Sequence, residues 1–165
     1  MKRYGKVLAW IAFLAISITI FGFSHQSAEQ SSKVSQSVLH EILLRIHPGY
    51  AGMVPMEQMS VIAIYHTWIR SAAHFSLYMI WGFTLSILLK TYQFGRKKLF
   101  ITVLTAGSTY AILDEIHQLF LKGRSAQLTD VLTDVFGVLT GLGCFLAIGI
   151  CYGRLRYQLF TKKNN

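Results

Sequence analysis

The chain has 165 residues, of which 53% are hydrophobic and only 14% are charged. This length suits one domain, but the composition is too apolar for an ordinary soluble protein, so we expect a small polytopic membrane protein. The formal net charge of +9 does not indicate nucleic-acid binding, because the basic residues are scattered along the chain and form no patch.

Four apolar segments predict four membrane-spanning helices. A helix needs roughly 20 residues to cross about 30 Å of hydrocarbon, so each segment is long enough if flanking residues snorkel or the bilayer thins slightly. The predicted spans are residues 7–23, 71–89, 99–121 and 131–152. We therefore expect an all-α fold, with residues 1–165 forming a single membrane domain.

The first span follows the basic sequence MKRYGK, as the apolar run of a secretory signal also does. Its apolar run is long for a cleaved signal, and only a weak small-x-small site follows, at Gly22 and Ser24. We expect a retained helix.

Residues 24–70 form the only long loop between the predicted spans. The loop opens with the polar stretch SHQSAEQSSKVSQS, which is typical of a solvated segment. From Val34 to Ile46 apolar residues recur with helical spacing, which predicts an amphipathic helix that ends before Pro48. This helix should lie along the outer membrane surface or cap the bundle. Helical spacing resumes from Met56 to Arg70, which allows the second span to begin well outside the membrane.

The distribution of Lys and Arg predicts the orientation. Eleven of the sixteen lie before the first span, between the second and third, or after the fourth, while the other two loops hold five although they are much longer. The positive-inside rule then puts both chain ends in the cytoplasm. All acidic residues and histidines fall on or near the outer side.

The third span carries ionisable groups into the membrane. The run Leu99–Leu113 has only fifteen residues and cannot cross unaided, so Ile116, Leu119 and Phe120 must complete the span. The outer turns of that helix therefore include four polar residues, and polar groups of the second and fourth spans lie at the same depth. Those of the third span are Asp114, Glu115, His117 and Gln118.

The polar residues of each span share one helix face at about 100° per residue. Charged groups in a membrane usually face the bundle interior and are functional candidates by default. Two glycines on the fourth span form a small-xxx-small pair that lets another helix approach closely. The three faces are Arg70, His74 and Tyr78; Tyr110, Asp114, His117 and Gln118; and Asp130, Asp134, Gly137 and Gly141.

Three other interpretations of these residues have different chemistry. Arg70 and Arg124 could pair with the carboxylates and hold the LKGRSAQ turn against the second helix, as structural ion pairs. His74 and His117 with carboxylates could bind a divalent metal, although no ligand-spacing motif such as HExxH is present. A Ser–His–Asp set has weaker support, because no serine lies in a recognisable nucleophile elbow.

Several stretches resemble the VanZ-like family of bacterial membrane proteins, and the resemblance covers all four spans. The stretches are FSHQSAEQSSKVS (Phe23–Ser35), RSAAHFSLY (Arg70–Tyr78) and DEIHQLFLKGRSAQLTDVLTDVFGVLTG (Asp114–Gly141). The family often has asparagine at the position of Asp134. Residues carried over by the resemblance are His74, Tyr78, Asp114, Glu115, His117, Gln118, Gly123, Arg124, Asp130, Gly137 and Gly141.

The resemblance implies a link to low-level resistance to teicoplanin, a glycopeptide that binds cell-wall precursors outside the membrane. The namesake is an accessory determinant of that resistance.

Two functions of different class are expected. The first is a binding protein whose outer polar pocket binds a lipid headgroup or lipid-linked cell-wall precursor. Arg70 and Arg124 would donate hydrogen bonds to its phosphate. The second is a membrane-embedded hydrolase or transferase acting on a lipid-linked substrate, with or without a metal. His74 or His117 would be the general base, and Asp114 or Glu115 would orient it or hold the metal. The sequence assigns no definite cofactor. A transporter is disfavoured, because no polar path crosses the cytoplasmic halves of the spans.

Overall fold

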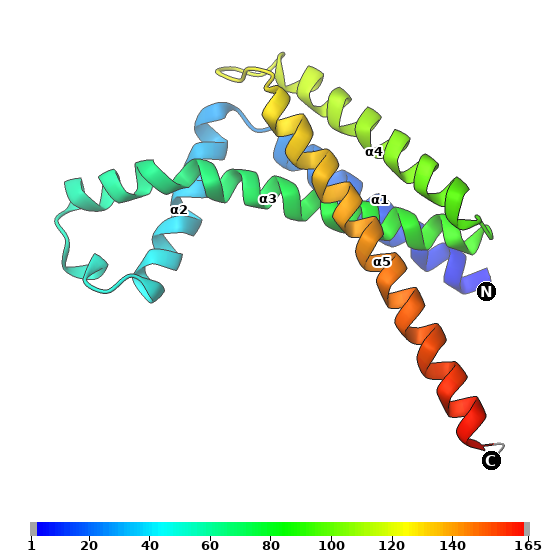
Figure 1. Cartoon of the computed structure of the whole chain (residues 1–165). Coiled ribbons are helices and arrows are strands. Elements are labelled where there is room, and N and C mark those ends of the chain that lie inside the picture. Colours follow the sequence, from blue (N-terminus) through cyan, green and yellow to red (C-terminus); the bar gives the residue numbers. More distant parts are fainter. Residues whose placement is uncertain (1–2, 164–165) are drawn as a thin grey trace.

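The computed structural model describes the backbone of residues 3–163 and the side chains of residues 3–152 (Figure 1). Four helices in this range are long and apolar enough to cross a membrane, which confirms the all-α class and makes the chain a multi-pass membrane protein. The elements are α1 (Arg3–Ser24), α2 (Ala28–Ile46), the 3₁₀ helix η1 (Tyr50–Gly52), α3 (Pro55–Thr91), α4 (Arg96–Gln118) and α5 (Leu128–Lys163). The candidate spans are α1, α3, α4 and the first 25 residues of α5.

The spanning helices do not end where the apolar runs end. α3 is one continuous helix of 37 residues that includes both the predicted second span and the stretch before it. Pro55 stands in its first turn, where a missing N–H is harmless, and Glu57 Oε2 accepts a hydrogen bond from Val54 N at 3.2 Å. α4 ends at Gln118, before the predicted end at residue 121, because the chain turns at Leu119.

The polar stretch after the first span was predicted to be a solvated segment, and it is helical for most of its length. Ser27 Oγ accepts a hydrogen bond from Gln30 N at 3.3 Å, and Gln30 Oε1 accepts one from Ser27 N at 3.0 Å. This capping box starts α2 at Ala28, well before the amphipathic pattern begins. The helix ends at Ile46, before Pro48 and Gly49, whose φ is +83°.

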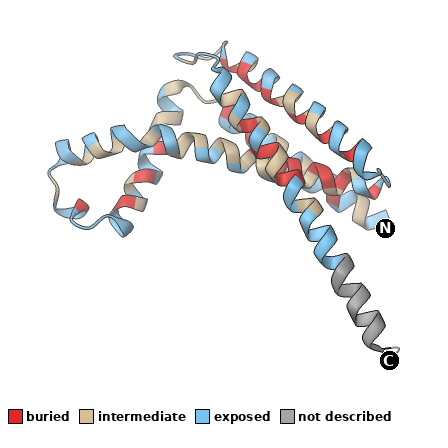
Figure 2. Ribbon diagram, viewed as in Figure 1, coloured by how far each residue is buried: buried red, intermediate tan, exposed pale blue. Residues whose placement is uncertain are grey.

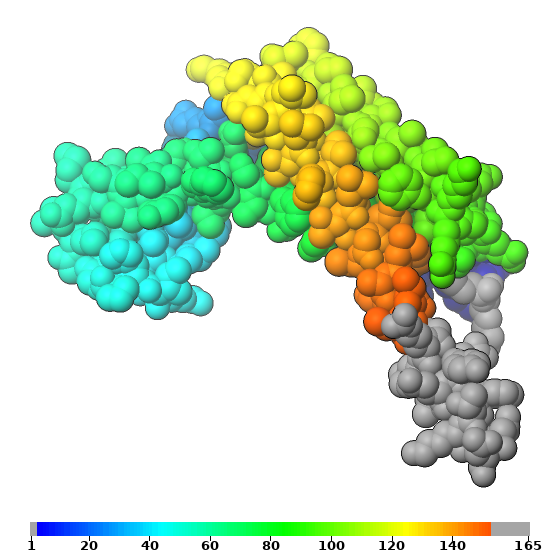
Figure 3. Space-filling model, in the orientation of Figure 1, coloured from blue at the N-terminus to red at the C-terminus, as the bar shows by residue number. Residues whose placement is uncertain are grey.

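α2, η1 and the first half of α3 form a helical hairpin that projects from the bundle as a separate lobe (Figures 1 and 3). Leu39 and Leu43 of α2 are buried with Tyr50 against apolar residues of α3. The predicted amphipathic helix therefore packs its apolar face on α3.

The tightest packing joins α5 to α3 and α4. Buried residues follow the lines along which these helices meet (Figure 2). Val138 is fully buried and contacts the positions of Gly82 on α3 and Gly107 on α4, while a Cβ on Gly137 would lie 2.5 Å from the Phe75 carbonyl oxygen. We call this close contact the glycine seam, and its glycines are Gly82, Gly107, Gly137 and Gly141. The seam confirms the predicted close approach at Gly137 and Gly141 and identifies α3 as the partner helix.

Candidate functional site

Polar side chains from four helices meet at one end of the bundle, which we call the polar end. It lies beside the α1–α2 link and the α4–α5 loop, and Ala28 N donates a hydrogen bond to Lys122 O at 3.2 Å to join these two segments. The opposite end holds the α3–α4 turn and the described start of α1 (Figure 1). The buried polar residues of the polar end are Ser24, Tyr78, Asp114, Glu115, Gln118 and Asp134.

Three residues on three helices lie at the centre of the polar end, and we call them the central cluster. His74 of α3, Asp114 of α4 and Asp134 of α5 each place one possible metal-ligating atom within 4.8 Å of the others. His74 Nδ1 and Asp134 Oδ1 are 3.5 Å apart. Asp134 has an exposed fraction of 0%, and neither of its carboxylate oxygens makes a hydrogen bond to the described residues. The nearby Tyr78 hydroxyl is also buried and also lacks a hydrogen-bond partner there.

Asp114 is held by a chain of hydrogen bonds that reaches the α4–α5 loop. Its Oδ2 accepts bonds from Ser24 Oγ at 2.8 Å and from Gln118 Nε2 at 3.2 Å. Arg124 Nη1 donates to Gln118 Oε1 at 3.2 Å, and Arg124 Nε donates to Gln26 O at 3.3 Å. These bonds fix the Asp114 carboxylate in one orientation.

Burial lowers the pKa of the Arg124 guanidinium, and the positive charge of Arg70 lowers it further. Arginine nevertheless stays protonated in proteins, so Arg124 keeps its charge and its donors. The side chain therefore serves as a permanent donor to the α1–α2 link and to Gln118.

The two arginines and the remaining carboxylates bind different partners. Arg70 Nη2 lies 3.3 Å from Asp130 Oδ2, which joins α3 to α5. Glu115 Oε2 accepts a hydrogen bond from Gln127 N at 2.8 Å and so fastens the loop to α4. Within residues 3–152, Arg70–Asp130 is the one arginine–carboxylate ion pair within 4.0 Å, because Arg124 binds amide and carbonyl oxygens instead.

His117 lies apart from the central cluster. Its Nε2 is 3.2 Å from His25 Nδ1, and the two rings stack with centroids 5.4 Å apart. Phe21 packs against the His117 ring on the same side of α1. The structure therefore does not bring His74 and His117 into one metal site, because the His117 side chain turns toward α1.

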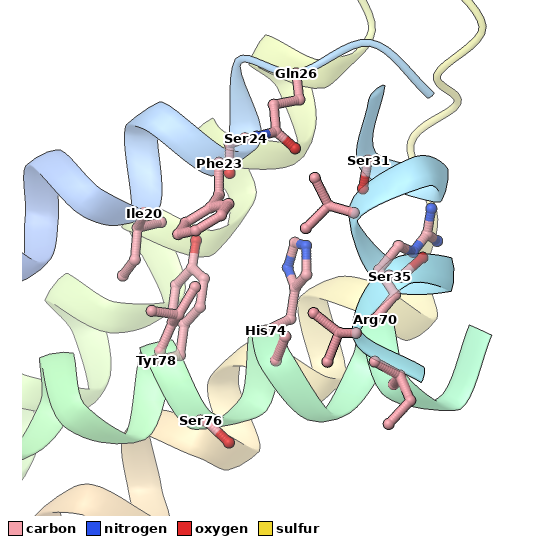
Figure 4. Close-up of a pocket in the computed structure, with 15 residues that line it drawn as sticks. Ile20, Phe23, Ser24, Gln26, Ser31, Ser35, Arg70, His74, Ser76 and Tyr78 are labelled. Carbon is pink, nitrogen blue, oxygen red and sulfur yellow. The ribbon is translucent and has the colours of Figure 1, made fainter. Parts of the chain in front are cut away.

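A cavity of about 330 Å³ lies between the end of α1, the first half of α2 and the middle of α3. The His74 ring points from α3 into the space between α1 and α2, Arg70 extends to α2, and Phe23 and Ser24 of α1 lie on the opposite side (Figure 4). The walls are mainly apolar, and the polar groups gather at His74, Arg70 and the α2 serines. Its lining comprises Ile20, Phe23, Ser24, Gln26, Ser31, Val34, Ser35, Val38, Ile69, Arg70, Ala73, His74, Ser76, Leu77 and Tyr78.

The cavity includes residues that the sequence interpretation did not select. Ser24 ends the first apolar run, and its hydrogen bond to Asp114 depends on a contact between α1 and α4 that has no sequence signal. A sequence signal did exist for the part of the cavity wall that α2 forms. Ser31 and Ser35 are spaced by four residues, as are Val34 and Val38, so each pair lies on one face of a helix. Of the residues predicted to bind a ligand, Arg70, His74 and Tyr78 line the cavity directly.

A profile of the VanZ/LLP1 family matches residues 9–150, which is most of the chain. The chain belongs to this family. No curated protein and no solved structure gives a significant match. The VanZ/LLP1 match confirms the resemblance seen in the sequence, and the matched range includes the central cluster, the cavity and the glycine seam.

Proposed function

We propose that this VanZ/LLP1 protein binds the headgroup of a membrane lipid or of a lipid-linked cell-wall precursor in the cavity between α1, α2 and α3. The observation that carries the proposal is a cavity with apolar walls that holds Arg70 and His74, in a chain with four apolar helices of spanning length. A volume of about 330 Å³ suits a headgroup, since ligand sites run from about 300 to 1,000 Å³.

We propose that the Arg70 guanidinium donates hydrogen bonds to the phosphate of the ligand. Arg70 lines the cavity, and its guanidinium carries five N–H donors, of which one bonds to Asp130 in the described part of the chain. The remaining planar fork matches the geometry of phosphate oxygens. Arg124 does not line the cavity, so we assign it a positioning role through Gln118 and Gln26 in place of direct phosphate binding.

Lipid retention tests this proposal. The wild-type chain is purified in mild detergent beside Arg70→Lys, which keeps the charge but loses the fork, and co-purifying lipids are measured by mass spectrometry. Arg45→Lys on α2 is the matched control, because Arg45 is exposed and does not line this cavity. We expect Arg70→Lys to lose an anionic lipid that the wild type and the control retain. Equal lipid content in all three would contradict the proposal.

The proposed orientation places both chain ends in the cytoplasm of a bacterial cell and the polar end near the outer surface. The support is the excess of Lys and Arg in the two chain ends and the α3–α4 connection. Lys97→Cys and Gln127→Cys are introduced separately after Cys144 and Cys151 are changed to serine. We expect impermeant thiol reagents on intact cells to label Gln127→Cys alone, and labelling of both from one side would overturn this topology.

A hydrolase or transferase acting on the same class of lipid is the second candidate. The 3.5 Å approach of His74 Nδ1 to Asp134 Oδ1 favours it, since a carboxylate beside a histidine can orient the ring as a general base. Incubation of the purified protein with the lipid that it retains decides between the two functions. Product formation that is lost in His74→Gln would make the protein an enzyme, and unchanged lipid would leave it a binding protein.

If the bound molecule is a lipid-linked cell-wall precursor, we propose that its binding at this site makes the cell more tolerant of glycopeptides. Expression of the chain in a teicoplanin-susceptible host should then raise the tolerated concentration of teicoplanin, and Arg70→Lys should remove that gain. Tolerance that is equal with and without the chain would remove antibiotic resistance from the proposed function.

A further inference from the structure

Asp134, at the polar end, has a buried carboxylate whose surroundings the proposed lipid binding does not explain. The Asp134 carboxylate is fully buried and lies between α5 and α3, yet neither of its oxygens accepts a hydrogen bond from the described residues. His74 Nδ1 lies 3.5 Å from Asp134 Oδ1, and the two form an ion pair only when the imidazole is protonated. Buried carboxylates in proteins are normally hydrogen-bonded, paired with a positive charge or bound to a metal.

We propose that His74, Asp114 and Asp134 bind one divalent transition-metal cation. Each residue contributes one possible ligand atom, and these atoms lie within 4.8 Å of one another. Zinc bonds to nitrogen and carboxylate oxygen are about 2.0–2.2 Å long, so two ligands in a tetrahedral arrangement are about 3.4 Å apart. The 3.5 Å between His74 Nδ1 and Asp134 Oδ1 matches that spacing, and the Asp114 ligand atom, which lies within 4.8 Å of the other two, would have to move closer to them on binding.

The charge of the group fits a divalent cation. Asp114 and Asp134 are both buried at the polar end, and together they carry two negative charges when ionised. Arg70 bonds to Asp130 and Arg124 bonds to Gln118 and Gln26, so neither arginine forms an ion pair with this group in the described chain. One divalent cation would neutralise both carboxylates and supply the missing partner of Asp134.

The surroundings of Asp114 resemble the outer shell of a metal site. Ligating carboxylates are themselves held by hydrogen bonds that orient them toward the metal. Ser24 and Gln118 both donate to Asp114 Oδ2, and Gln118 is in turn fixed by Arg124. An imidazole nitrogen with two carboxylates suits zinc or manganese better than magnesium or calcium, which prefer oxygen ligands alone.

The cation site goes beyond the proposed function and does not depend on lipid binding. His74 nevertheless lines the cavity as well as the cluster (Figure 4). A cation bound to His74 therefore lies beside the headgroup cavity, and the chemical class of ligand that it would attract there is a phosphate.

Metal content of the purified protein tests the inference. The wild-type chain in detergent is stripped with a chelator, dialysed and titrated with Zn²⁺, and bound metal is counted by mass spectrometry. We expect one equivalent per chain in the wild type and a loss of at least tenfold in affinity for Asp134→Asn and His74→Gln. Asp130→Asn is the matched control, because Asp130 pairs with Arg70 outside the group, and it should keep the full equivalent.

A second measurement covers the case in which a variant fails to fold. Co²⁺ bound to the stripped wild-type protein should give visible absorption bands that one equivalent of Zn²⁺ displaces and that excess Mg²⁺ or Ca²⁺ does not. Absence of both Zn²⁺ binding and Co²⁺ bands in a folded wild type would overturn the site. Metal binding that persists equally in folded Asp134→Asn and His74→Gln would assign the cation to other residues and also overturn it. Lipid content measured on the same samples shows separately whether headgroup binding stands.

Discussion

The two sides of α3 differ sharply in how closely they are packed. On one side, the glycine seam brings the α5 backbone so near that a Cβ on Gly137 would meet the Phe75 carbonyl oxygen at 2.5 Å. On the other side, the same turns of α3 face a cavity of about 330 Å³ between α1 and α2. Tyr78 lies between the two regions, because it borders Gly137 of the seam and also lines the cavity.

We infer from this difference that the seam side of α3 determines stability and the cavity side determines binding. The absence of side chains at Gly82, Gly107, Gly137 and Gly141 lets α5 approach α3 and α4 closely, as small residues do in membrane helix interfaces. A bundle fixed in this way can leave a cavity on its other side without losing its shape. Changes in the seam should therefore affect folding, whereas changes on the cavity wall should affect ligand content.

Gly141→Val should have the largest effect on stability. A Cβ at this position would overlap the Met79 carbonyl oxygen of α3, and a backbone group cannot move aside as a flexible side chain can. We expect a loss of about 3 kcal/mol or more, seen as a much lower melting temperature in detergent. Gly143→Val is the matched control, because a Cβ there meets no atom within 4 Å. Equal melting of the two variants would show that the seam does not hold the bundle together.

Ser24→Ala should have an intermediate effect, because it acts where the two regions meet. Removing the Ser24 hydroxyl takes one of two donors from the buried Asp114 Oδ2, which should cost about 1–3 kcal/mol. Ser60→Ala is the control, since Ser60 is exposed, bonds to Met56 O in its own helix and does not line the cavity. The same comparison should show weaker Zn²⁺ binding in Ser24→Ala. A melting temperature equal to that of Ser60→Ala would mean that this bond contributes nothing to the fold.

The sequence predicted the elements of the glycine seam but not most of the cavity. Apolar length predicted the four spans, and the spacing of Gly137 and Gly141 predicted a close helix contact, because both depend on residues near one another in the chain. The capping box of Ser27 and Gln30 was also readable, yet the polar composition around it favoured a solvated segment. The amphipathic pattern predicted the apolar face of α2, but it did not show that this face packs on α3.

The polar faces were predicted more accurately than the contacts between them. Asp114 and Gln118 turn inward as the helical period requires, and both are buried. His117 lies about 60° from Asp114 around the helix, at the edge of that face, so a small difference in rotation decides whether it joins the cluster. In the structure it stacks on His25, and this depends on where α1 packs.

Ala73→Trp should have the smallest effect on stability and the clearest effect on ligand content. Ala73 lines the cavity, so an indole at this position occupies space that we propose for the headgroup and displaces no packed backbone. The melting temperature should stay close to that of Ala72→Trp, a control on the adjacent position of α3, which is also exposed and does not line the cavity. Lipid measured by mass spectrometry should fall in Ala73→Trp alone, while Zn²⁺ binding by His74, Asp114 and Asp134 should persist because their ligand atoms are untouched. If Ala73→Trp kept all of its lipid, the headgroup would have to bind outside this cavity. Collapse of its melting temperature would show instead that the cavity side supports the fold as strongly as the seam does.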